Sequence, residues 1–363
     1  MRILQVINSL STGGAEKLIM ESVPIYQKKG LKTDVLLLSN KKTSFWEELK
    51  LISTACIKGL TLHSIYNPFL IFRIIPYLKK YDIVHLHLFP TLYLVVLAKV
   101  LSFSNVKLIY TEHSTNNRRR SSFFWKTIDK FIYSKLAIIV TIAKEVDLNL
   151  KKHLNFPSSK FKMIHNGVDI DRFATAVAYS KDVFFSLNDF ILIQVSSFRW
   201  QKDQATLIKS LKFLPLNVKL LLVGDGNLKN DCVELVKNLE LEERVNFLGN
   251  RNDVPQLLIT ADVVVLSSKY EGLSLSNIEG MSVDKPFIGS DVPGLREIVN
   301  GYGLLFKQGD EKDLARLVRN LMNDSNFYQK TASACFDRAK NFDINTMVEE
   351  YIKLYKTVLN APT

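Results

Sequence analysis

Cysteine is scarce in this chain, and its three copies are widely separated. Cys56, Cys232 and Cys335 form no CxxC pair among the 363 residues, so the sequence indicates neither a disulfide framework nor a zinc site. A secretory signal is also lacking. The start Met-Arg-Ile-Leu-Gln-Val-Ile is typical of a buried strand, without the basic head, longer apolar run and small-residue cleavage site of a leader. We therefore expect a cytoplasmic protein.

Uninterrupted apolar segments are lacking as well. The longest apolar stretch, residues 83–101, contains His85, His87, Pro90 and Lys99. We expect a strand over Ile83–Leu88 and then a core helix, and no membrane span. The overall composition, with 47% apolar and 23% charged residues, is that of a folded globular protein. A chain of this length suits two domains.

Acidic residues are few in the first half of the chain. Residues 1–185 hold 27 Lys and Arg against 13 Asp and Glu, and the remainder holds 21 against 23, so the net charge of +12 arises in the first half. Basic surfaces attract nucleic acid, anionic lipid or phosphorylated substrates, or serve solubility alone. Arg118–Arg120 stand beside Phe123, Phe124 and Trp125. Such a segment suits an anionic bilayer surface, although an ordinary basic loop is the alternative.

Strand-like runs alternate with helical stretches along the whole chain, which predicts an α/β fold with parallel sheets. We expect two doubly wound Rossmann-like domains, residues 1–167 and 168–343, and an amphipathic helix over 344–360 that can pack back on the first domain. Ligands of such folds bind at the carboxyl ends of the strands, so the site is expected in an inter-domain cleft. The expected strands are Arg2–Ile7, Thr33–Leu38, Ile83–Leu88, Lys107–Tyr110, Ala137–Thr141, Lys162–Ile164, Phe190–Val195, Lys219–Val223, Val245–Leu248, Val263–Leu266 and Pro286–Ser290.

The segment Ser267–Gly280 carries the most chemistry. It follows the expected strand Val263–Leu266 and opens a helix near Ser274, where free backbone N–H groups and the positive end of the helix dipole favour phosphate. Glu279 lies about one turn inside this helix, and a carboxylate there can accept hydrogen bonds from both hydroxyls of a ribose. Glu271 lies in the preceding loop and could meet sugar hydroxyls. Spacing alone leaves open a capping glutamate and a solvated one.

These residues also resemble a family. Glu271 and Glu279, with seven residues between them and followed by Gly272 and Gly280-Met281 respectively, resemble the signature of the retaining glycosyltransferases of family 4, which have the two-domain GT-B fold. The resemblance covers nearly all of residues 160–310. It includes His165-Asn166-Gly167-Val168-Asp169, Leu222-Val223-Gly224-Asp225-Gly226, Val245-Asn246-Phe247-Leu248-Gly249, Lys285-Pro286, Ser290-Asp291-Val292-Pro293-Gly294, Glu297-Ile298-Val299 and Gly303-Leu304-Leu305.

The resemblance implies roles for individual residues of the donor site. Glu279 would hold the donor ribose, and Glu271 would lie near the hydroxyls of the transferred sugar. Backbone N–H groups of Gly272, Leu273, Ser274 and Leu275 would face the distal phosphate. The base would be held at Asn250 and Arg251 through backbone contacts.

Other residues are expected around the leaving group and the acceptor. A cationic pair should neutralise the diphosphate as the glycosidic bond breaks, and the candidates are Arg199 and Lys202. The sequence departs from the family here: aligning on Lys202 puts Ser196-Ser197 where members commonly carry Gly-Arg, so either Arg199 serves from within the loop or Lys202 serves alone. Gly13 and Gly14 open a helix, and the resemblance places them near the diphosphate and acceptor. His113 follows a strand and would lie near the sugar, where it could stabilise positive charge at the anomeric carbon or orient the acceptor.

Two further motifs point elsewhere. Gly224-Asp225-Gly226 lacks the third glycine of a dinucleotide fingerprint. Asp169-Ile170-Asp171 is a DxD, the metal-binding feature of the other large glycosyltransferase fold, but it lies at the domain boundary, where a turn role is expected. We predict no metal and no cofactor beyond the nucleotide-sugar donor.

The function implied by the resemblance is retaining transfer of a hexosyl or N-acetylhexosaminyl group from a nucleotide sugar, with UDP as the expected nucleotide. The acceptor would be a hydroxyl of a glycan or polyprenyl-linked acceptor in cell-surface polysaccharide synthesis, with the enzyme peripheral on the anionic cytoplasmic face of the membrane. The alternatives are a nucleotide-sugar 2-epimerase of the same fold, or a basic nucleic-acid-binding protein. No nucleic-acid motif is present, and paired glutamates would repel a phosphate backbone, so we expect no nucleic acid partner.

Overall fold

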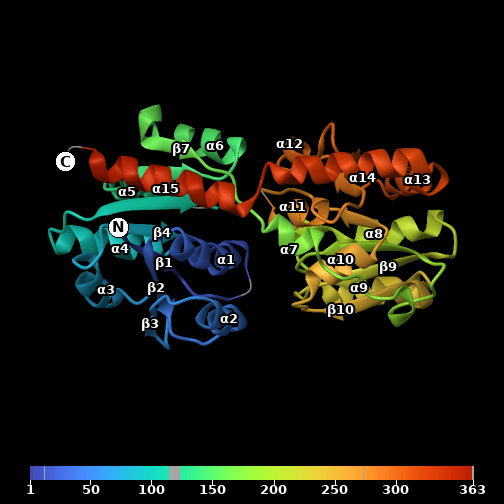
Figure 1. Ribbon diagram of the computed structural model, residues 1–363, viewed down its shortest axis with the longest axis horizontal. Helices are drawn as coiled ribbons and strands as arrows, with labels where there is room; N and C mark the ends of the chain where they lie inside the picture. Colours follow the sequence, from blue (N-terminus) through green and yellow to red (C-terminus); the bar gives the residue numbers. More distant parts are fainter. Residues whose placement is uncertain (12, 114–122, 273, 362–363) are drawn as a thin grey trace. The chain divides into compact units, whose positions relative to one another are not determined.

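The chain divides into two compact units (Figure 1). The computed structural model describes residues 1–11, 13–113, 123–272 and 274–361. The first unit comprises Met1–Gly167 and the C-terminal segment from Ile344, and the second comprises Val168–Asp343. Two expectations, the basic segment Arg118–Arg120 and the phosphate-facing Leu273, lie outside the described residues.

The first unit is built on a seven-stranded sheet with the order β3-β2-β1-β4-β5-β6-β7, in which every neighbouring pair is parallel. Its strands are β1 (Arg2–Ile7), β2 (Lys32–Ser39), β3 (Ile57–Thr61), β4 (Ile83–His87), β5 (Lys107–Glu112), β6 (Ile138–Thr141) and β7 (Phe161–Met163). All five residues of β4 are buried, because a central parallel strand is covered by helices on both faces.

Helices cover both faces of this sheet. One face carries α3 (Leu70–Leu78), α4 (Thr91–Leu101), α5 (Phe123–Ser134) and α6 (Lys144–Leu154), whose apolar side chains form one core with the strands. The other face carries α1 (Gly14–Lys28) and α2 (Ser44–Ile52). The C-terminal helix α15 (Ile344–Asn360), red in Figure 1, packs on α1. The segment 83–101 is strand β4 followed by helix α4, as the interrupting polar residues predicted. Within the described residues, no helix has the length and apolarity needed to span a bilayer.

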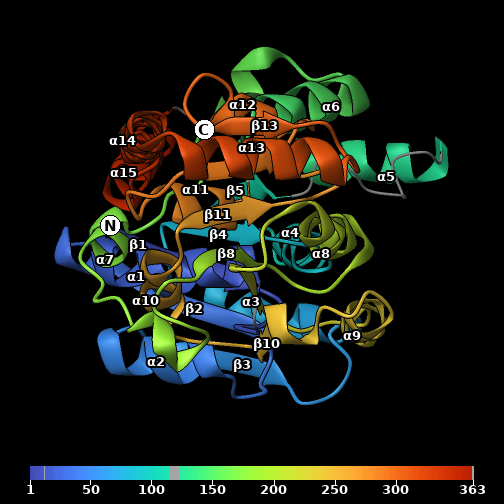
Figure 2. The same cartoon turned by 90° about the vertical axis from the view of Figure 1, so that its right-hand side faces the viewer.

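The second unit repeats the architecture with six parallel strands in the order β10-β9-β8-β11-β12-β13. One core joins the sheet to α8, α9 and α13, which neighbour one another in the order α13, α8, α9 (Figure 2). The strands are β8 (Phe190–Val195), β9 (Val218–Val223), β10 (Val245–Gly249), β11 (Val263–Leu266), β12 (Phe287–Ser290) and β13 (Leu304–Phe306). The helices are α7 (Ile170–Ala174), α8 (Gln204–Ser210), α9 (Lys229–Asn238), α10 (Val254–Thr260), α11 (Leu275–Met281), α12 (Leu295–Val299), α13 (Glu311–Asn323) and α14 (Ser325–Lys340).

The predicted α/β fold class with two doubly wound parallel sheets is therefore confirmed. The strands that the sequence did not indicate are β3 and β13, each at the edge of its sheet. Edge strands are covered less completely, so their apolar pattern is weaker. In both sheets the strand order reverses at the middle, between β1 and β4 in the first and between β8 and β11 in the second. Such switch points are where doubly wound folds bind their ligands.

Candidate active site

A buried glutamine lies at the switch point of each sheet. Gln5 is the fourth residue of β1 and Gln194 the fifth of β8, and both are almost completely buried. A buried amide is costly unless its donor and acceptor are satisfied. Each glutamine forms a hydrogen bond with a residue at the carboxyl end of the neighbouring central strand, Gln5 with His87 and Gln194 with Ser267.

In the second unit, Gln194 joins three loops. Its Oε1 accepts a hydrogen bond from Ser267 Oγ at 2.8 Å, and Ser267 follows β11. Its Nε2 donates to the Lys202 carbonyl oxygen at 3.1 Å and to Ser196 Oγ at 3.0 Å. Gln204 adds a second donor to Ser196 Oγ at 3.1 Å. The backbone around Lys202 is thereby tied to the carboxyl ends of both β8 and β11.

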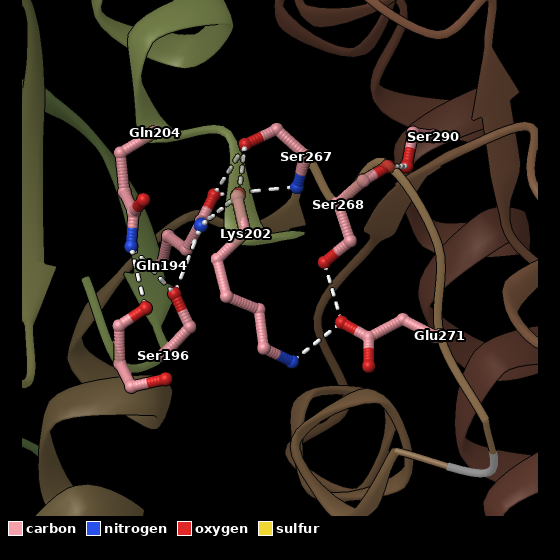
Figure 3. Close-up of polar contacts among 9 residues, drawn as sticks. Gln194, Ser196, Lys202, Gln204, Ser267, Ser268, Glu271 and Ser290 are labelled. Carbon is pink, nitrogen blue, oxygen red and sulfur yellow. Dashed lines mark hydrogen bonds and ion pairs between the residues drawn. The ribbon is translucent and has the colours of Figure 1, made fainter. Parts of the chain in front are cut away.

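The fixed backbone places Lys202 against Glu271, and Figure 3 shows this contact. Lys202 Nζ lies 2.5 Å from Glu271 Oε1, with the two side chains 19% and 10% exposed. Ser268 Oγ donates to the same carboxylate oxygen at 2.5 Å, and the Ser268 carbonyl accepts from Ser290 Oγ. A cation and a carboxylate are thus held together, nearly dehydrated, at one edge of the sheet. In such surroundings electrostatic interactions are stronger than in water.

Glycines allow the neighbouring loops to pack on this pair. A Cβ at Gly294, whose φ is +86°, would lie 2.5 Å from the Glu271 carbonyl oxygen. A Cβ at Gly224 would lie 2.2 Å from the Ser196 carbonyl oxygen, and one at Gly226 would lie 2.4 Å from that of Phe198. The Gly-Asp-Gly segment therefore serves loop packing beside the candidate site, which accounts for two of its glycines without a dinucleotide.

Helix α11 brings the second glutamate to the same region of the fold. Ser274 precedes α11 in an extended conformation, and Glu279, 4% exposed, is its fifth residue. Leu275 and Gly272 flank the helix start. Asn277, in the same helix, is fully buried, and among the described residues neither of its amide atoms has a hydrogen-bond partner.

Within the described residues, no side-chain hydrogen bond links the other residues expected on the second unit to the Lys202–Glu271 pair. Arg199 is exposed and begins the short 3₁₀ helix Trp200–Lys202. Asn250 is also exposed. Arg251 binds Asp253 through two hydrogen bonds, of 2.8 and 2.5 Å. The Arg251 guanidinium, with Tyr179 as a further donor, lowers the pKa of Asp253 to about 2.

In the first unit, Gln5 begins a chain of two imidazoles. Gln5 Oε1 accepts from His87 Nε2 at 2.9 Å, and His87 Nδ1 lies 3.0 Å from His113 Nε2. Because the glutamine oxygen can only accept, neutral His87 carries its proton on Nε2 and offers Nδ1 as an acceptor. His113 then donates from Nε2, and its Nδ1 is left as an acceptor. The expected site residue His113 is thus held in one tautomer by Gln5 and His87.

The surroundings keep these histidines neutral. Burial lowers the pKa of His113 to about 4 and that of His85 to about 3, and it lowers the pKa of His87 as well. His85 bonds to Tyr355 and Thr111, at 2.7 and 2.8 Å. A cavity of about 20 Å³ is lined by Gln5, Tyr26, His85, His87, His113 and Asn166, among others. That volume can hold about one water molecule.

The glycine loop of the first unit has a carboxylate folded onto it. Gly13 precedes α1, which begins at Gly14. A Cβ at Gly13 would lie 2.3 Å from Glu16 Oε2. Burial raises the pKa of Glu16. Gly13 thus leaves room for the glutamate beside the helix start.

The DxD segment, which lies at the start of the second unit, has a structural role. Asp169 accepts a hydrogen bond from the Arg172 backbone N–H at 3.0 Å and caps α7, and Asp171 lies in the first turn of that helix. Within the described ranges, no three His, Cys, Asp or Glu side chains are grouped so that they could bind a metal ion.

Sequence reasoning missed the polar residues that support the site: Gln5, Gln194, Ser267, Ser268 and Ser290. A signal for two of them was present. Arg-Ile-Leu-Gln-Val-Ile and Phe-Ile-Leu-Ile-Gln-Val each place one glutamine near the end of an otherwise apolar strand. A buried amide in a parallel strand must find partners on its neighbours, so such a residue marks a polar network at the strand ends.

Comparison with known proteins gives matches along most of the chain. Residues 178–340 match the family model "Glycosyl transferases group 1", and residues 12–172 match "Glycosyltransferase Family 4". The N-acetyl-alpha-D-glucosaminyl L-malate synthase of Bacillus anthracis is 27% identical over 292 residues, which cover 77% of this chain and 76% of that protein. The N-acetylgalactosamine-N,N'-diacetylbacillosaminyl-diphospho-undecaprenol 4-alpha-N-acetylgalactosaminyltransferase of Campylobacter jejuni is 25% identical over 367 residues, covering 96% and 97%.

A solved structure has the same fold. HepE of Anabaena, in complex with UDP and glucose, superposes with a TM-score of 0.86 at 22% identity, covering 98% of this chain and 99% of the other. Two doubly wound parallel-sheet units, with their polar residues at the switch points, define a protein of the GT-B class. The two family models together span most of the sequence, and the chain belongs to the family 4 glycosyltransferases.

Proposed function

We propose that this glycosyltransferase moves a hexosyl or N-acetylhexosaminyl group from a UDP-sugar, with retention of configuration, to a hydroxyl of a lipid-linked glycan acceptor in cell-surface polysaccharide synthesis. The observation that carries the proposal is the Lys202–Glu271 contact beside the start of α11. A cation is held there next to a carboxylate and a set of backbone N–H groups. Those are the groups that a diphosphate and a sugar ring require.

In the proposed mechanism, the donor binds to the second unit. Glu279 accepts hydrogen bonds from the ribose hydroxyls, and the loop at Asn250 and Arg251 holds the base. Lys202, with Arg199 from the same loop, compensates charge on the diphosphate. Glu271, whose carboxylate already accepts from Lys202 and Ser268, orients the sugar hydroxyls. The N–H groups around Gly272, Ser274 and Leu275 face the distal phosphate.

The bond changes balance without a further reactant. The bond between the anomeric carbon and the phosphate oxygen breaks, and its electron pair leaves with the diphosphate. The acceptor oxygen bonds to the anomeric carbon on the same face, and its proton passes to the departing phosphate oxygen. Neutral His113 supplies a lone pair on Nδ1 near the developing positive charge, and Gly13 and Gly14 give the acceptor and diphosphate room to approach. No metal takes part in this scheme.

The acceptor class is supported by the relative that covers nearly the whole chain, since its name specifies a diphospho-undecaprenol-linked acceptor. The relative whose name specifies L-malate supplies the contrasting possibility of a small acid. UDP is supported by the bound nucleotide of the structural neighbour.

The test is release of nucleoside diphosphate. Purified protein is mixed with UDP- and GDP-sugars and with either an undecaprenyl-diphosphate-linked sugar or L-malate, and the anomeric configuration of the product is determined by NMR. Glu279→Gln should abolish most turnover while circular dichroism is unchanged. Glu234→Gln, at an exposed glutamate of α9, is the matched control and should behave as the parent. Parent-like turnover in Glu279→Gln would refute the site, and free sugar formed without any acceptor would favour the epimerase.

A further inference from the structure

Helix α3 has two faces of different character. Leu70, Ile71, Ile74 and Leu78 are buried in the core of the first unit. On the opposite side, Phe69 just before the helix and Phe72 within it are 71% and 63% exposed. Arg73 and Pro76 are exposed on the same side. These residues recur at the three- and four-residue spacing of one helical face, so the rings point outward together.

The exposed aromatic surface continues beyond the helix. Tyr66, 63% exposed, precedes α3, and its ring lies 6.1 Å from that of Phe89. Phe89 follows the carboxyl end of β4, the strand that carries His87. Leu62, which follows β3, is 62% exposed. The surface therefore reaches the strand ends at which the candidate acceptor residues of this unit lie.

The same segment contains only basic charges. Residues 49–81 include no Asp or Glu, while Lys50, Lys58, Arg73, Lys79 and Lys80 carry five positive charges. Arg73, Lys79 and Lys80 are exposed, and none of the three forms an ion pair within the described ranges. The whole chain has a net charge of +12. Five of its positive charges lie in this run of 33 residues without a carboxylate, which is therefore a local excess of positive charge. Its complement is an anionic surface.

We propose that the α3 surface, defined as Tyr66, Phe69, Phe72, Arg73, Lys79 and Lys80, docks the first unit on an anionic lipid bilayer. Aromatic rings partition to the headgroup level, and long basic side chains reach the lipid phosphates. Since α3 has nine residues, it lies along the interface and does not cross the bilayer. The proposal deepens the proposed function, because a lipid-linked acceptor would then lie at the same surface, but vesicle binding itself does not depend on the transfer reaction.

Vesicle flotation tests the proposal with the full-length protein. The parent should bind vesicles of equal parts phosphatidylglycerol and phosphatidylcholine, and should bind pure phosphatidylcholine much more weakly. Arg73→Gln with Lys79→Gln and Lys80→Gln should lower the partition coefficient on the anionic vesicles about 100-fold at low salt, since each cation contributes about fivefold. Phe69→Ser with Phe72→Ser should lower it about tenfold at both low and high salt.

The control variant replaces two similarly exposed apolar residues of the second unit. Leu187→Ser with Leu216→Ser removes side chains that are 64% and 79% exposed and should leave vesicle binding unchanged. Parent-like binding by both α3-surface variants would overturn the proposal. So would a parent that fails to bind the anionic vesicles and instead self-associates through these rings in gel filtration.

A parallel activity assay separates this proposal from the proposed function. With a water-soluble acceptor analogue, the Phe69→Ser/Phe72→Ser variant should turn over the donor as the parent does, and with the acceptor embedded in vesicles it should be slower. If no nucleotide sugar is turned over by the parent but vesicle binding still depends on the α3 surface, the proposed function fails and the docking surface stands.

Discussion

The two units share one kind of buried support but differ in the charge of the side chains beside it. Each has a glutamine near the end of its first strand, at the switch point of its sheet, bonded to the end of the neighbouring central strand. In the first unit Gln5 leads to His87 and His113, which burial keeps neutral. In the second unit Gln194 holds the backbone of Lys202, whose side chain contacts the Glu271 carboxylate.

The difference extends to composition. All six histidines of the chain precede residue 168, so the second unit has none. The first unit therefore offers lone pairs and neutral donors, which suit a neutral sugar or acceptor hydroxyl. The second unit offers fixed charges, which suit a diphosphate. One fold with one kind of supporting amide can thus serve both partners of a transfer reaction, because only the side chains beyond the glutamine change.

Acidification should give the largest difference in stability between the two units. An unfolded histidine titrates near pH 6.5, whereas in the folded unit His113 and His85 have pKa values of about 4 and 3. As the pH falls, the unfolded state binds protons first, so stability decreases from about pH 6.5 downward until the folded groups titrate. At pH 5 each of these histidines should cost the first unit about 2 kcal/mol. Glu16, whose pKa burial raises, acts in the opposite direction.

The measurement is urea unfolding at pH 7 and pH 5, followed in peptides of each unit by hydrogen exchange corrected for the intrinsic rate. The second unit should lose much less stability over this range. His63→Gln, at an exposed position, is the control and should keep the pH dependence of the parent. Equal losses in the two units would contradict the comparison.

Removing the fixed cation should give the next largest effect. Lys202→Met should lower turnover about 100- to 1000-fold, as does the loss of one preorganised group that stabilises a developing charge. Stability should fall too, because Glu271 is left nearly buried without its cation. Initial rates and thermal unfolding measure the two effects.

A second substitution separates catalysis from structure. Adding Glu271→Gln to Lys202→Met removes the unpaired carboxylate and should restore much of the stability without restoring turnover. Lys229→Met, in a long contact with Asp225 at 3.8 Å, serves as the surface control. Recovery of turnover in the double variant would mean that the pair has a structural role alone.

The fold could be predicted from the sequence because the central strands are buried on both faces. Runs such as Ile191–Ile193 and Val263–Leu266 are apolar throughout, and only a covered parallel sheet requires this. The short edge strands β3 and β13 were missed because their partial exposure removes that requirement. The two glutamates and Lys202 could be singled out as candidates because each lies in the loop after a strand or in the first turns of a helix.

The contacts among site residues could not be predicted in the same way. That Lys202 contacts Glu271 depends on Gln194 and Ser267, 73 positions apart in the chain, and on Gly294 packing over the loop. His113 was singled out by its place after β5, but its tautomer is set by Gln5, more than 100 residues earlier. Such pairings arise from strand order, which local sequence patterns do not encode.

Breaking the amide support of the first unit should have a smaller effect than removing Lys202. Gln5→Met deletes the acceptor of His87 Nε2, so that His113 is no longer held in one tautomer. This change should lower kcat about fivefold, because one hydrogen bond contributes about 1 kcal/mol. The KM for the donor should be unchanged. Gln5→Glu restores an acceptor and should recover part of kcat with a new pH dependence. A Gln5→Met variant that lost stability but kept kcat would leave Gln5 a structural role only.

The smallest expected effect is on stability, and it comes from one residue in each unit whose buried polar group is unsatisfied. Thr33 Oγ1 in β2 and both amide atoms of Asn277 in α11 have no hydrogen-bond partner among the described residues. Replacing such a group by an apolar one of similar shape removes a desolvation cost, so Thr33→Val and Asn277→Leu should each stabilise the protein by about 1 kcal/mol. Asn277 lies two residues before Glu279. If the Asn277 amide binds the donor, Asn277→Leu should also weaken UDP-sugar binding, measured by calorimetry, whereas Thr33→Val should leave this binding unchanged. Equal donor affinity in both variants would show that the buried amide of Asn277 has no part in the site.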